Sequence, residues 1–243
     1  MKIIQSHSNS PIYNLALEEY LFSEFQDDIL LFYINDKSVI VGSNQSVRNE
    51  VNQEFCRANN IQIVRRKSGG GTVFQDTGNL NFSFINDKSV GVDSLSSNFL
   101  QPIAAWLNEL GVEVTIGDRK DLWLPDGFKI SGTASQIRKN RELHHGTLLV
   151  DANLDLLQQS LFVPTIDTMI KATLSVRSKT KNIVDYLSEN KILFLSAKNF
   201  MDKLIAISEK HFNTKKVDAT YFDQPTIYQL QLNYQSDAWN FRK

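Results

Sequence analysis

Two hydrophobic periods alternate along the chain and predict a mixture of helices and strands. A helix is predicted to begin at Ser10-Pro11, because a serine side chain can accept a hydrogen bond from a free amide and proline fits the first helical position. Its apolar residues fall on one face, so Glu18 and Glu19 are expected to turn away from the core. Further helices are expected at residues 99–110, from about residue 153 onward, and around 200–207 with Ser196 as the cap.

Short runs rich in β-branched and aromatic residues predict the strands. They lie at residues 30–34, 38–42, 61–66, 80–85, 112–117, 121–130, 142–151 and 226–234. The first two flank the polar link NDK, which predicts a hairpin, and the run at 121–130 is expected to form a hairpin of its own. No repeat or linker interrupts the chain, so residues 1–243 are expected to form one domain. This order of elements favours an α+β fold with a mainly antiparallel or mixed sheet and flanking helices.

The composition is that of an ordinary globular protein without a strong net charge. Of 243 residues, 42% are hydrophobic and 22% are charged, and the formal net charge is −1. Such a chain has no overall field to attract nucleic acid or an anionic membrane, and no apolar run approaches the roughly 20 residues that span a bilayer. A single cysteine and the lack of a secretory signal fit a reducing compartment. We therefore expect a cytoplasmic protein that binds neither nucleic acid nor membrane.

Three consecutive glycines follow a run of cations in RRKSGGGTVFQDTGN, at residues 65–79. They fall in a connection between two predicted strands, where glycine allows positive φ and lets a ligand touch the backbone. Successive amides in such a turn can converge into an anion-binding nest, with Arg66 adding positive charge. The run is neither a P-loop, since Lys67-Ser68 precede the glycines, nor a dinucleotide fingerprint, since the glycines are contiguous. A phosphate or carboxylate site and a mobile hairpin tip both remain open.

The second candidate feature is the predicted hairpin DLWLPDGFKI. Its turn, Pro125-Asp126-Gly127, places Trp123 opposite Lys129, and Asp121 falls on the same face. An ammonium for phosphate and a carboxylate for Mg²⁺ would together suit a nucleotide triphosphate. The alternative is an ordinary ion pair on the surface.

The third feature is HHGTLL at residues 144–149, which contains two of the four histidines. Adjacent residues of a strand point to opposite faces, so only one of His144 and His145 can face a given pocket. No cysteine or carboxylate stands nearby at the spacing of metal ligands, so a metal site has weak support. A pocket histidine and a structural histidine with a hydrogen-bonded ring remain the two interpretations.

Taken together, these segments resemble the lipoate–protein ligase family of the biotin/lipoyl-attachment superfamily. The similar segments follow the family's order along nearly the whole chain, at 9–22, 38–52, 65–84, 118–122, 128–134, 144–149, 175–183 and 237–243. The glycine motif, KISGTA and HHGTLL are together highly specific. The resemblance implies the α+β catalytic fold of class II synthetases and biotin/lipoyl ligases.

The resemblance also implies an ATP-dependent reaction in two steps. The carboxylate of lipoate attacks the α-phosphorus of ATP, which gives lipoyl-AMP and pyrophosphate. A lysine of an acceptor protein then attacks the mixed anhydride and releases AMP. ATP with Mg²⁺ is implied, and the implied acceptors are lipoyl domains of 2-oxoacid dehydrogenase E2 subunits and the glycine-cleavage H protein.

The matched motifs assign roles to individual residues. Lys129 is the implied catalytic residue, a fixed charge that bonds both the carboxylate and the α-phosphate. The implied lipoyl-binding residues are Tyr33, Arg66, Ser68, Gly69, Gly70, Gly71 and His145. The implied nucleotide-binding residues are Thr72, Val73, Phe74, Asn79, Asp121, Lys129, Ser131 and Gly132, with Asp121 also as the Mg²⁺ ligand.

Two departures from the family pattern matter. Position 75, where several members carry histidine, is Gln75, which argues against a general base there. Larger members continue past the segment 237–243 into a small accessory domain, whereas this sequence ends there, so we expect the catalytic domain alone. Its adenylation is expected to be slow, to need a separate accessory polypeptide, or to be unnecessary when preformed lipoyl-AMP is supplied.

Two other functions compete with the ligase. An octanoyl or lipoyl transferase on the same fold would use preformed acyl-AMP or an acylated carrier protein, and its cysteine form needs a thiolate at the acyl carbonyl. Cys56 is the only cysteine, and its place in a predicted helix before the strand at 61–66 favours a half-buried structural role. The second alternative is a catalytically silent module that senses lipoate, against which the presence of Lys129 argues.

Overall fold

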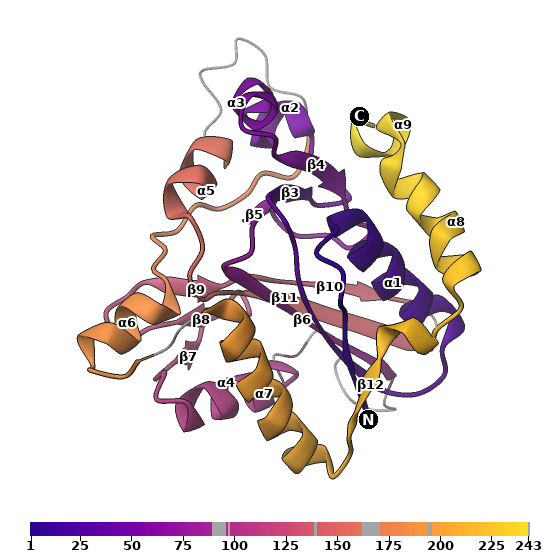
Figure 1. Cartoon of the computed structure of the whole chain (residues 1–243). Coiled ribbons are helices and arrows are strands. Elements are labelled where there is room, and N and C mark those ends of the chain that lie inside the picture. Colours follow the sequence, from indigo (N-terminus) through magenta and orange to yellow (C-terminus); the bar gives the residue numbers. More distant parts are fainter. Residues whose placement is uncertain (89–95, 97, 139, 162–170, 194–195, 243) are drawn as a thin grey trace.

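The computed structural model describes residues 1–88, 96, 98–138, 140–161, 171–193 and 196–242 (Figure 1). The helices are α1 (Pro11–Glu24), α2 (Val47–Glu50), α3 (Gln53–Ala58), α4 (Leu100–Glu109), α5 (Leu154–Leu161), α6 (Ile183–Glu189), α7 (Ala197–Phe212), the short 3-10 helix η1 (Ala219–Tyr221), α8 (Gln224–Gln235) and α9 (Asp237–Asn240). The strands are β1 (Lys2–Gln5), β2 (Ile29–Ile34), β3 (Ser38–Val41), β4 (Gln62–Arg65), β5 (Val73–Gln75), β6 (Asn79–Asp87), β7 (Thr115–Ile116), β8 (Leu122–Trp123), β9 (Lys129–Ser131), β10 (Thr133–Ile137), β11 (Arg141–Leu149) and β12 (Lys216–Asp218).

A six-stranded mixed sheet forms the centre of the molecule, in the order β10-β11-β6-β2-β1-β12. β1 pairs in parallel with β2 and β12, and the remaining pairs of this sheet are antiparallel. Side chains of β2 alternate between its faces, since Leu30 and Phe32 belong to one apolar cluster and Leu31 and Tyr33 to another. Helices α4 and α7 pack on the first cluster, and α1 and α8 pack on the second (Figure 1). The predicted α+β fold with a mixed sheet is confirmed.

Two small sheets carry the segments that sequence analysis singled out. The sheet β4-β3-β5 holds the glycine run in the connection between β4 and β5. The sheet β7-β8-β9 contains the hairpin predicted at 121–130, in which Trp123 pairs with Lys129. The strand predicted at 112–117 is reduced to the two residues of β7.

The hairpin predicted for residues 30–34 and 38–42 is wrong. β2 pairs with β1 and β6 in the central sheet, whereas β3 pairs with β4 and β5. Every residue of β2 is buried, so this strand needs cover on both faces and a neighbour on both edges. The polar link at 35–37 therefore passes from one sheet to another instead of closing a turn.

The strand predicted at 226–234 is also wrong, because these residues form most of helix α8. The side chain of Asp223 caps the helix by accepting a hydrogen bond from the amide of Thr226, and Pro225 lies in the first turn. Ile227 and Tyr234, two helical turns apart, are the residues that α8 buries. The segment 226–234 therefore has buried residues at a helical spacing as well as the alternation of polar and apolar residues that predicted a strand.

The remaining predicted helices are present. Ser10 caps α1 by accepting a hydrogen bond from the Tyr13 amide, and Ser196 caps α7 in the same way. Gly111 follows α4 with a φ of +84°, as expected of a glycine that ends a helix. Within the described ranges, no helix is long and apolar enough to cross a membrane.

Candidate active site

The glycine run forms a loop whose conformation requires glycine at one position above all. Gly70 has a φ of +80°, in the left-handed region that other residues rarely adopt. A Cβ on Gly70 would lie 3.1 Å from the Cβ of Ala134, whereas a Cβ on Gly69 would meet nothing within 4 Å. At Gly42, a Cβ would lie only 2.1 Å from the carbonyl oxygen of Gly70. The glycines therefore allow two segments of the protein itself, the turn after β3 and the glycine loop, to approach each other closely.

Arg66 is buried against this loop, and its guanidinium donates to one side chain and to three backbone carbonyl groups. Its Nε lies 3.0 Å from Ser68 Oγ, and its Nη1 lies 2.9 Å from the carbonyl oxygen of Ile40. Its Nη2 lies 2.6 Å and 2.7 Å from the carbonyl oxygens of Gly69 and Gly71. Burial lowers the pKa of Arg66 to about 10, which leaves it charged near neutral pH. Arg66 thus shapes the loop by holding its carbonyl groups.

The loop consequently presents amide groups on the side away from Arg66. In a planar trans peptide the carbonyl and the following amide point in opposite directions, so the amides of Gly70 and Thr72 point away from the guanidinium. The Thr72 amide donates to Ser175 Oγ at 3.1 Å. Between described residues, no hydrogen bond engages the amides of residues 69–71. Such a series of amides is suited to a phosphate or a carboxylate.

Lys129 presents the other cation of the site. Its Nζ lies 2.9 Å from Asp121 Oδ2, and Trp123 donates its indole N–H to Asp121 Oδ1 at 2.9 Å. Burial opposes the charged form of Asp121, but the hydrogen bonds from Lys129 and Trp123 outweigh it and lower the pKa of this carboxyl. The expected shared face of Lys129, Asp121 and Trp123 is confirmed, and it is a partly buried ion pair rather than an exposed one.

Two cavities meet at Lys129. The smaller has a volume of about 150 Å³ and the larger about 880 Å³. The residues that line both are Thr72, Val73, Lys129, Gly132, Thr147, Ser175 and Val176. Of the other predicted site residues, Tyr33, Arg66, Gly71 and His145 line the smaller cavity, and Phe74 and Ser131 line the larger. Ser68, Gly69, Gly70, Asn79 and Asp121 line neither.

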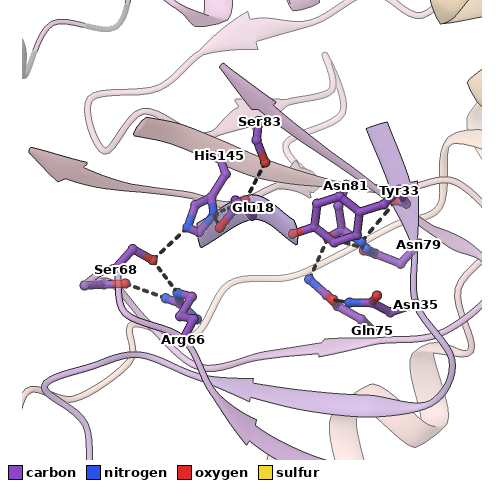
Figure 2. Close-up of polar contacts among 11 residues, drawn as sticks. Glu18, Tyr33, Asn35, Arg66, Ser68, Gln75, Asn79, Asn81, Ser83 and His145 are labelled. Atoms are coloured by element: carbon purple, nitrogen blue, oxygen red, sulfur yellow. Dashed lines mark hydrogen bonds and ion pairs between the residues drawn. The ribbon is translucent and has the colours of Figure 1, made fainter. Parts of the chain in front are cut away.

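His145 faces the smaller cavity, and its neighbour faces the opposite side of β11, as the alternation of a strand requires. The Nε2 of His145 lies 2.8 Å from Ser68 Oγ, and its Nδ1 lies 2.9 Å from a carboxylate oxygen of Glu18 (Figure 2). His144 instead stacks on Phe99, with ring centroids 4.6 Å apart. Only His145 belongs to the site, and its ring is fixed at both nitrogen atoms.

Glu18 was expected to turn away from the core, and this expectation is wrong. Its exposed fraction is 5%, and it accepts a hydrogen bond from Ser83 Oγ at 2.5 Å besides its contact with His145. Although burial favours the neutral acid, His145 and Ser83 outweigh it and lower the pKa of Glu18. The sequence did contain a signal, because Asn14 and Glu18 lie one turn apart on the apolar side of α1.

A second polar network borders the same cavity. Gln75 accepts a hydrogen bond from Asn35 at 2.6 Å and donates one to Asn81 at 2.6 Å (Figure 2). Both partners fix the orientation of the Gln75 amide, which lines the smaller cavity. Tyr33 lies beside this network, and burial raises the pKa of its hydroxyl well above the usual value, so it stays neutral. The cavity therefore has a polar but uncharged wall at this end.

Asn79 was predicted to lie near the nucleotide, but the structure does not bring it to either cavity. Asn79 is fully buried, and its side-chain Nδ2 donates to Asn81 Oδ1 at 3.2 Å. Its side-chain Oδ1 has no hydrogen-bond partner within the described residues. Ser131 differs, because its hydroxyl also lacks a described partner but the residue lines the larger cavity. Of these two residues, only Ser131 can offer a hydrogen bond to a ligand there.

The Mg²⁺ role of Asp121 stays a prediction, and in the structure the carboxylate is engaged by protein donors. One carboxylate oxygen is paired with Lys129 and the other accepts from Trp123, so no oxygen is left without a protein donor. Among the described residues there is no group of three or more histidine, cysteine, aspartate or glutamate residues that could hold a metal ion. In this structure, Asp121 pairs with Lys129 and accepts a hydrogen bond from Trp123.

Cys56 lies in α3 and is fully buried in the apolar cluster that contains Val39 and Phe74. Burial also raises the pKa of its thiol, which opposes formation of a thiolate. The residue lines neither cavity. The thioester mechanism therefore lacks a nucleophile at the described site.

The family model described as the lipoyl protein ligase A/B catalytic domain matches residues 10–207. Lipoate–protein ligase 1 of Staphylococcus aureus is 37% identical over 245 residues, which cover 99% of this chain and 73% of that protein. A bipartite lipoate protein ligase from Thermoplasma acidophilum, described with its E2 lipoyl domain, has a TM-score of 0.79 at 26% identity, covering 99% of this chain and 95% of the other.

A lipoate–protein ligase A bound with ATP shares the fold, with a TM-score of 0.78, 24% identity and 99% of both chains covered. The fold, the family match and the similarity to known lipoate–protein ligases together show that this protein is a ligase. More particularly, the chain belongs to the lipoyl protein ligase A/B catalytic domain family, so the resemblance stated from its sequence is confirmed.

Proposed function

We propose that the chain is an ATP-dependent lipoate–protein ligase, which forms lipoyl-AMP and then transfers the lipoyl group to a lysine of an acceptor protein. The position of Lys129 carries this proposal. Lys129 lines both cavities, and Asp121 is the carboxylate that pairs with its ammonium group. An ammonium has three N–H donors, so a ligand in each cavity can share it.

In the first step, the smaller cavity takes the acyl chain and the larger takes the nucleotide. Leu15, Ile40 and Tyr33 offer the smaller cavity an apolar lining, which suits the hydrocarbon part of lipoate. A carboxylate oxygen attacks the α-phosphorus, the bond from that phosphorus to the bridging oxygen breaks, and pyrophosphate leaves. Lys129 reduces the repulsion between the two anions, and the amides of the glycine loop stabilise charge on the acyl-phosphate.

In the second step, the uncharged amine of an acceptor lysine attacks the carbonyl carbon of lipoyl-AMP. The bond from that carbon to the phosphate oxygen breaks, AMP leaves with the electron pair, and the amine loses a proton as the amide forms. The proposed acceptors are lipoyl domains of E2 subunits, in keeping with the Thermoplasma ligase described with such a domain, and the glycine-cleavage H protein. Mg²⁺ is proposed to enter with the phosphates of ATP, and no step here depends on it.

The test is release of pyrophosphate by the purified chain from ATP and lipoate, with lipoyl-AMP identified by mass spectrometry. Release that requires lipoate but not the acceptor is the expected result. A parallel reaction supplies lipoyl-AMP and an acceptor domain without ATP, and another adds an accessory polypeptide in trans. Transfer from supplied lipoyl-AMP, with no lipoyl-AMP made from ATP under any condition, would instead identify a transferase.

A further inference from the structure

A chain of buried polar side chains runs from helix α1 to the glycine loop (Figure 2). Ser83 donates to Glu18 at 2.5 Å, and Glu18 lies 2.9 Å from Nδ1 of His145. Nε2 of His145 lies 2.8 Å from Ser68 Oγ, which in turn lies 3.0 Å from Nε of Arg66. All five residues are at most 8% exposed, and they come from α1, β6, β11 and the segment after β4.

The chemistry of the two ends allows one arrangement of protons in which every donor of this chain has an acceptor within it. Arg66 can only donate, so Ser68 Oγ accepts from it and keeps its own O–H for His145. A Glu18 carboxylate can only accept, so His145 donates to it from Nδ1, and an imidazole protonated there alone can accept from Ser68 at Nε2. Each donor then has an acceptor when His145 is neutral and carries its proton on Nδ1.

The far end of this chain sets the geometry of the glycine loop. Ser68 holds Arg66 at its Nε, and the same guanidinium holds the carbonyl groups of Gly69 and Gly71 through Nη2. A planar guanidinium cannot turn one of these contacts without moving the others. The loop amides on the opposite side therefore depend on the orientation of Arg66.

We infer that Glu18 is a positioning residue of the reaction: through His145, Ser68 and Arg66 it orients the backbone amides of the glycine loop. Glu18 lines neither cavity, so it acts on the reacting groups through neighbouring side chains and not by contact with them. The inference rests on the proposed function for its kinetic readout, whereas the state of His145 can be measured without any substrate.

The experiment compares the wild-type chain with Glu18→Gln, which keeps the size of the side chain. A glutamine amide can donate to Nδ1, so the imidazole proton is free to move to Nε2, and Ser68 then loses the acceptor of its O–H. The ¹⁵N NMR signals of the His145 ring are expected to change from the Nδ1–H tautomer to another state. The kcat/KM of lipoyl-AMP formation is expected to fall by about 10-fold to 100-fold, less than the roughly 10²–10³ for removal of an oriented donor, because the loop amides are misaligned but still present.

A double-mutant cycle separates a relay from two independent structural effects. Ser68→Ala breaks the same chain at a different place. The kcat/KM of the double variant Glu18→Gln with Ser68→Ala is therefore expected to lie within about twofold of that of the less active single variant. The matched control is His144→Gln, which changes the neighbouring histidine on the other face of β11. It is expected to leave kcat/KM within about twofold and to help assign the His145 signals.

The outcomes are distinguishable. A Glu18→Gln variant that keeps the His145 tautomer and the wild-type kcat/KM overturns the inference, and so do losses that multiply in the double variant. A wild-type chain that makes no lipoyl-AMP, either alone or with the accessory polypeptide, overturns the proposed function instead, while the tautomer still tests the relay. Should Glu18→Gln not fold by circular dichroism, the pair His145→Gln and Ser68→Ala provides the same cycle.

Discussion

Arg66 and Lys129 both line the smaller cavity, yet the protein holds these two cations in opposite ways. Arg66 is 5% exposed and gives four hydrogen bonds to Ser68 and to backbone carbonyl groups. Lys129 keeps 18% of its side chain exposed, and among the described residues it has one ion-pair partner, Asp121. A cation whose donors are taken by the protein can orient a backbone, whereas a cation with donors to spare can bind a ligand.

The side-chain types suit these two tasks. A guanidinium offers five N–H donors in a fixed plane, which allows Arg66 to hold several carbonyl groups in one arrangement. An ammonium is a compact charge on a flexible stem, which allows Lys129 to follow charge as it moves from carboxylate to phosphate. Exchanging the two types should therefore damage each position differently.

The largest effect is expected for Lys129→Met. Losing one preorganised donor at the site of charge development should lower the rate of lipoyl-AMP formation by about 10²–10³, with the fold retained. Pyrophosphate release in a single turnover measures this. Lys181→Met is the matched control, since Lys181 is also partly buried and pairs with Asp126 and Glu189 beside the same hairpin. Equal losses in the two variants would contradict a special role of Lys129.

A smaller loss of rate, with a clear loss of stability, is expected for Arg66→Lys. Lysine keeps the charge but cannot reach Ser68 and three separated carbonyl groups together, and each buried group left unpaired costs about 1–3 kcal/mol. We expect kcat/KM to fall by about tenfold and the unfolding midpoint in urea to fall as well. Arg57→Lys, at an exposed residue of α3, should change neither quantity. Wild-type stability of Arg66→Lys would show that the carbonyl contacts do not hold the loop.

Gly70→Ala should destabilise the chain by about 1–2 kcal/mol, because alanine pays the usual cost of a left-handed conformation. The added Cβ also crowds Ala134 and Arg66, at 3.1 Å and 3.2 Å, so Gly70→Val should distort the loop from within as well as obstruct a ligand. Gly69→Ala is the control, since its Cβ meets nothing within 4 Å and its φ is not positive. Similar unfolding free energies for the two alanine variants would refute the assignment of strain to Gly70.

The smallest effect is a pH dependence at Asp121. Its pKa is lower in the folded chain than in the unfolded one, so its pairing stabilises the fold above the unfolded pKa of about 3.9 and is lost as the pH falls through the folded value. Asp121→Asn should therefore reduce the free energy of unfolding at pH 6 to 7, and the difference from wild type should shrink toward about pH 2. A constant difference across this range would mean that the charge of Asp121 is not involved.

Local signals made much of the site predictable from the sequence. The turn Pro125-Asp126-Gly127 fixes the register that brings Asp121 to Lys129, and consecutive glycines mark the loop between β4 and β5. Alternation along β11 is enough to separate His144 from His145. In each case the informative residues are neighbours in the sequence, so these predictions did not require knowledge of the tertiary contacts.

The parts that could not be predicted depend on contacts between distant segments. Glu18 is buried because His145 and Ser83, more than 60 residues away, provide its hydrogen bonds, and a helical pattern cannot show such partners. β2 and β3 belong to different sheets because their partners come from elsewhere in the chain. The alternation in 226–234 suits a strand, but the cap at Asp223 and packing on α1 stabilise a helix there.

The central claim is that the Lys129 ammonium lies between the acyl group and the nucleotide during activation. A crystal structure of the chain with a non-hydrolysable analogue of lipoyl-AMP tests it most directly. We expect Nζ of Lys129 within hydrogen-bond distance, about 2.7–3.2 Å, of oxygen atoms on both the acyl and the phosphate side of the analogue. An ammonium that remains on Asp121 alone, with the analogue bound out of its reach, would contradict the account.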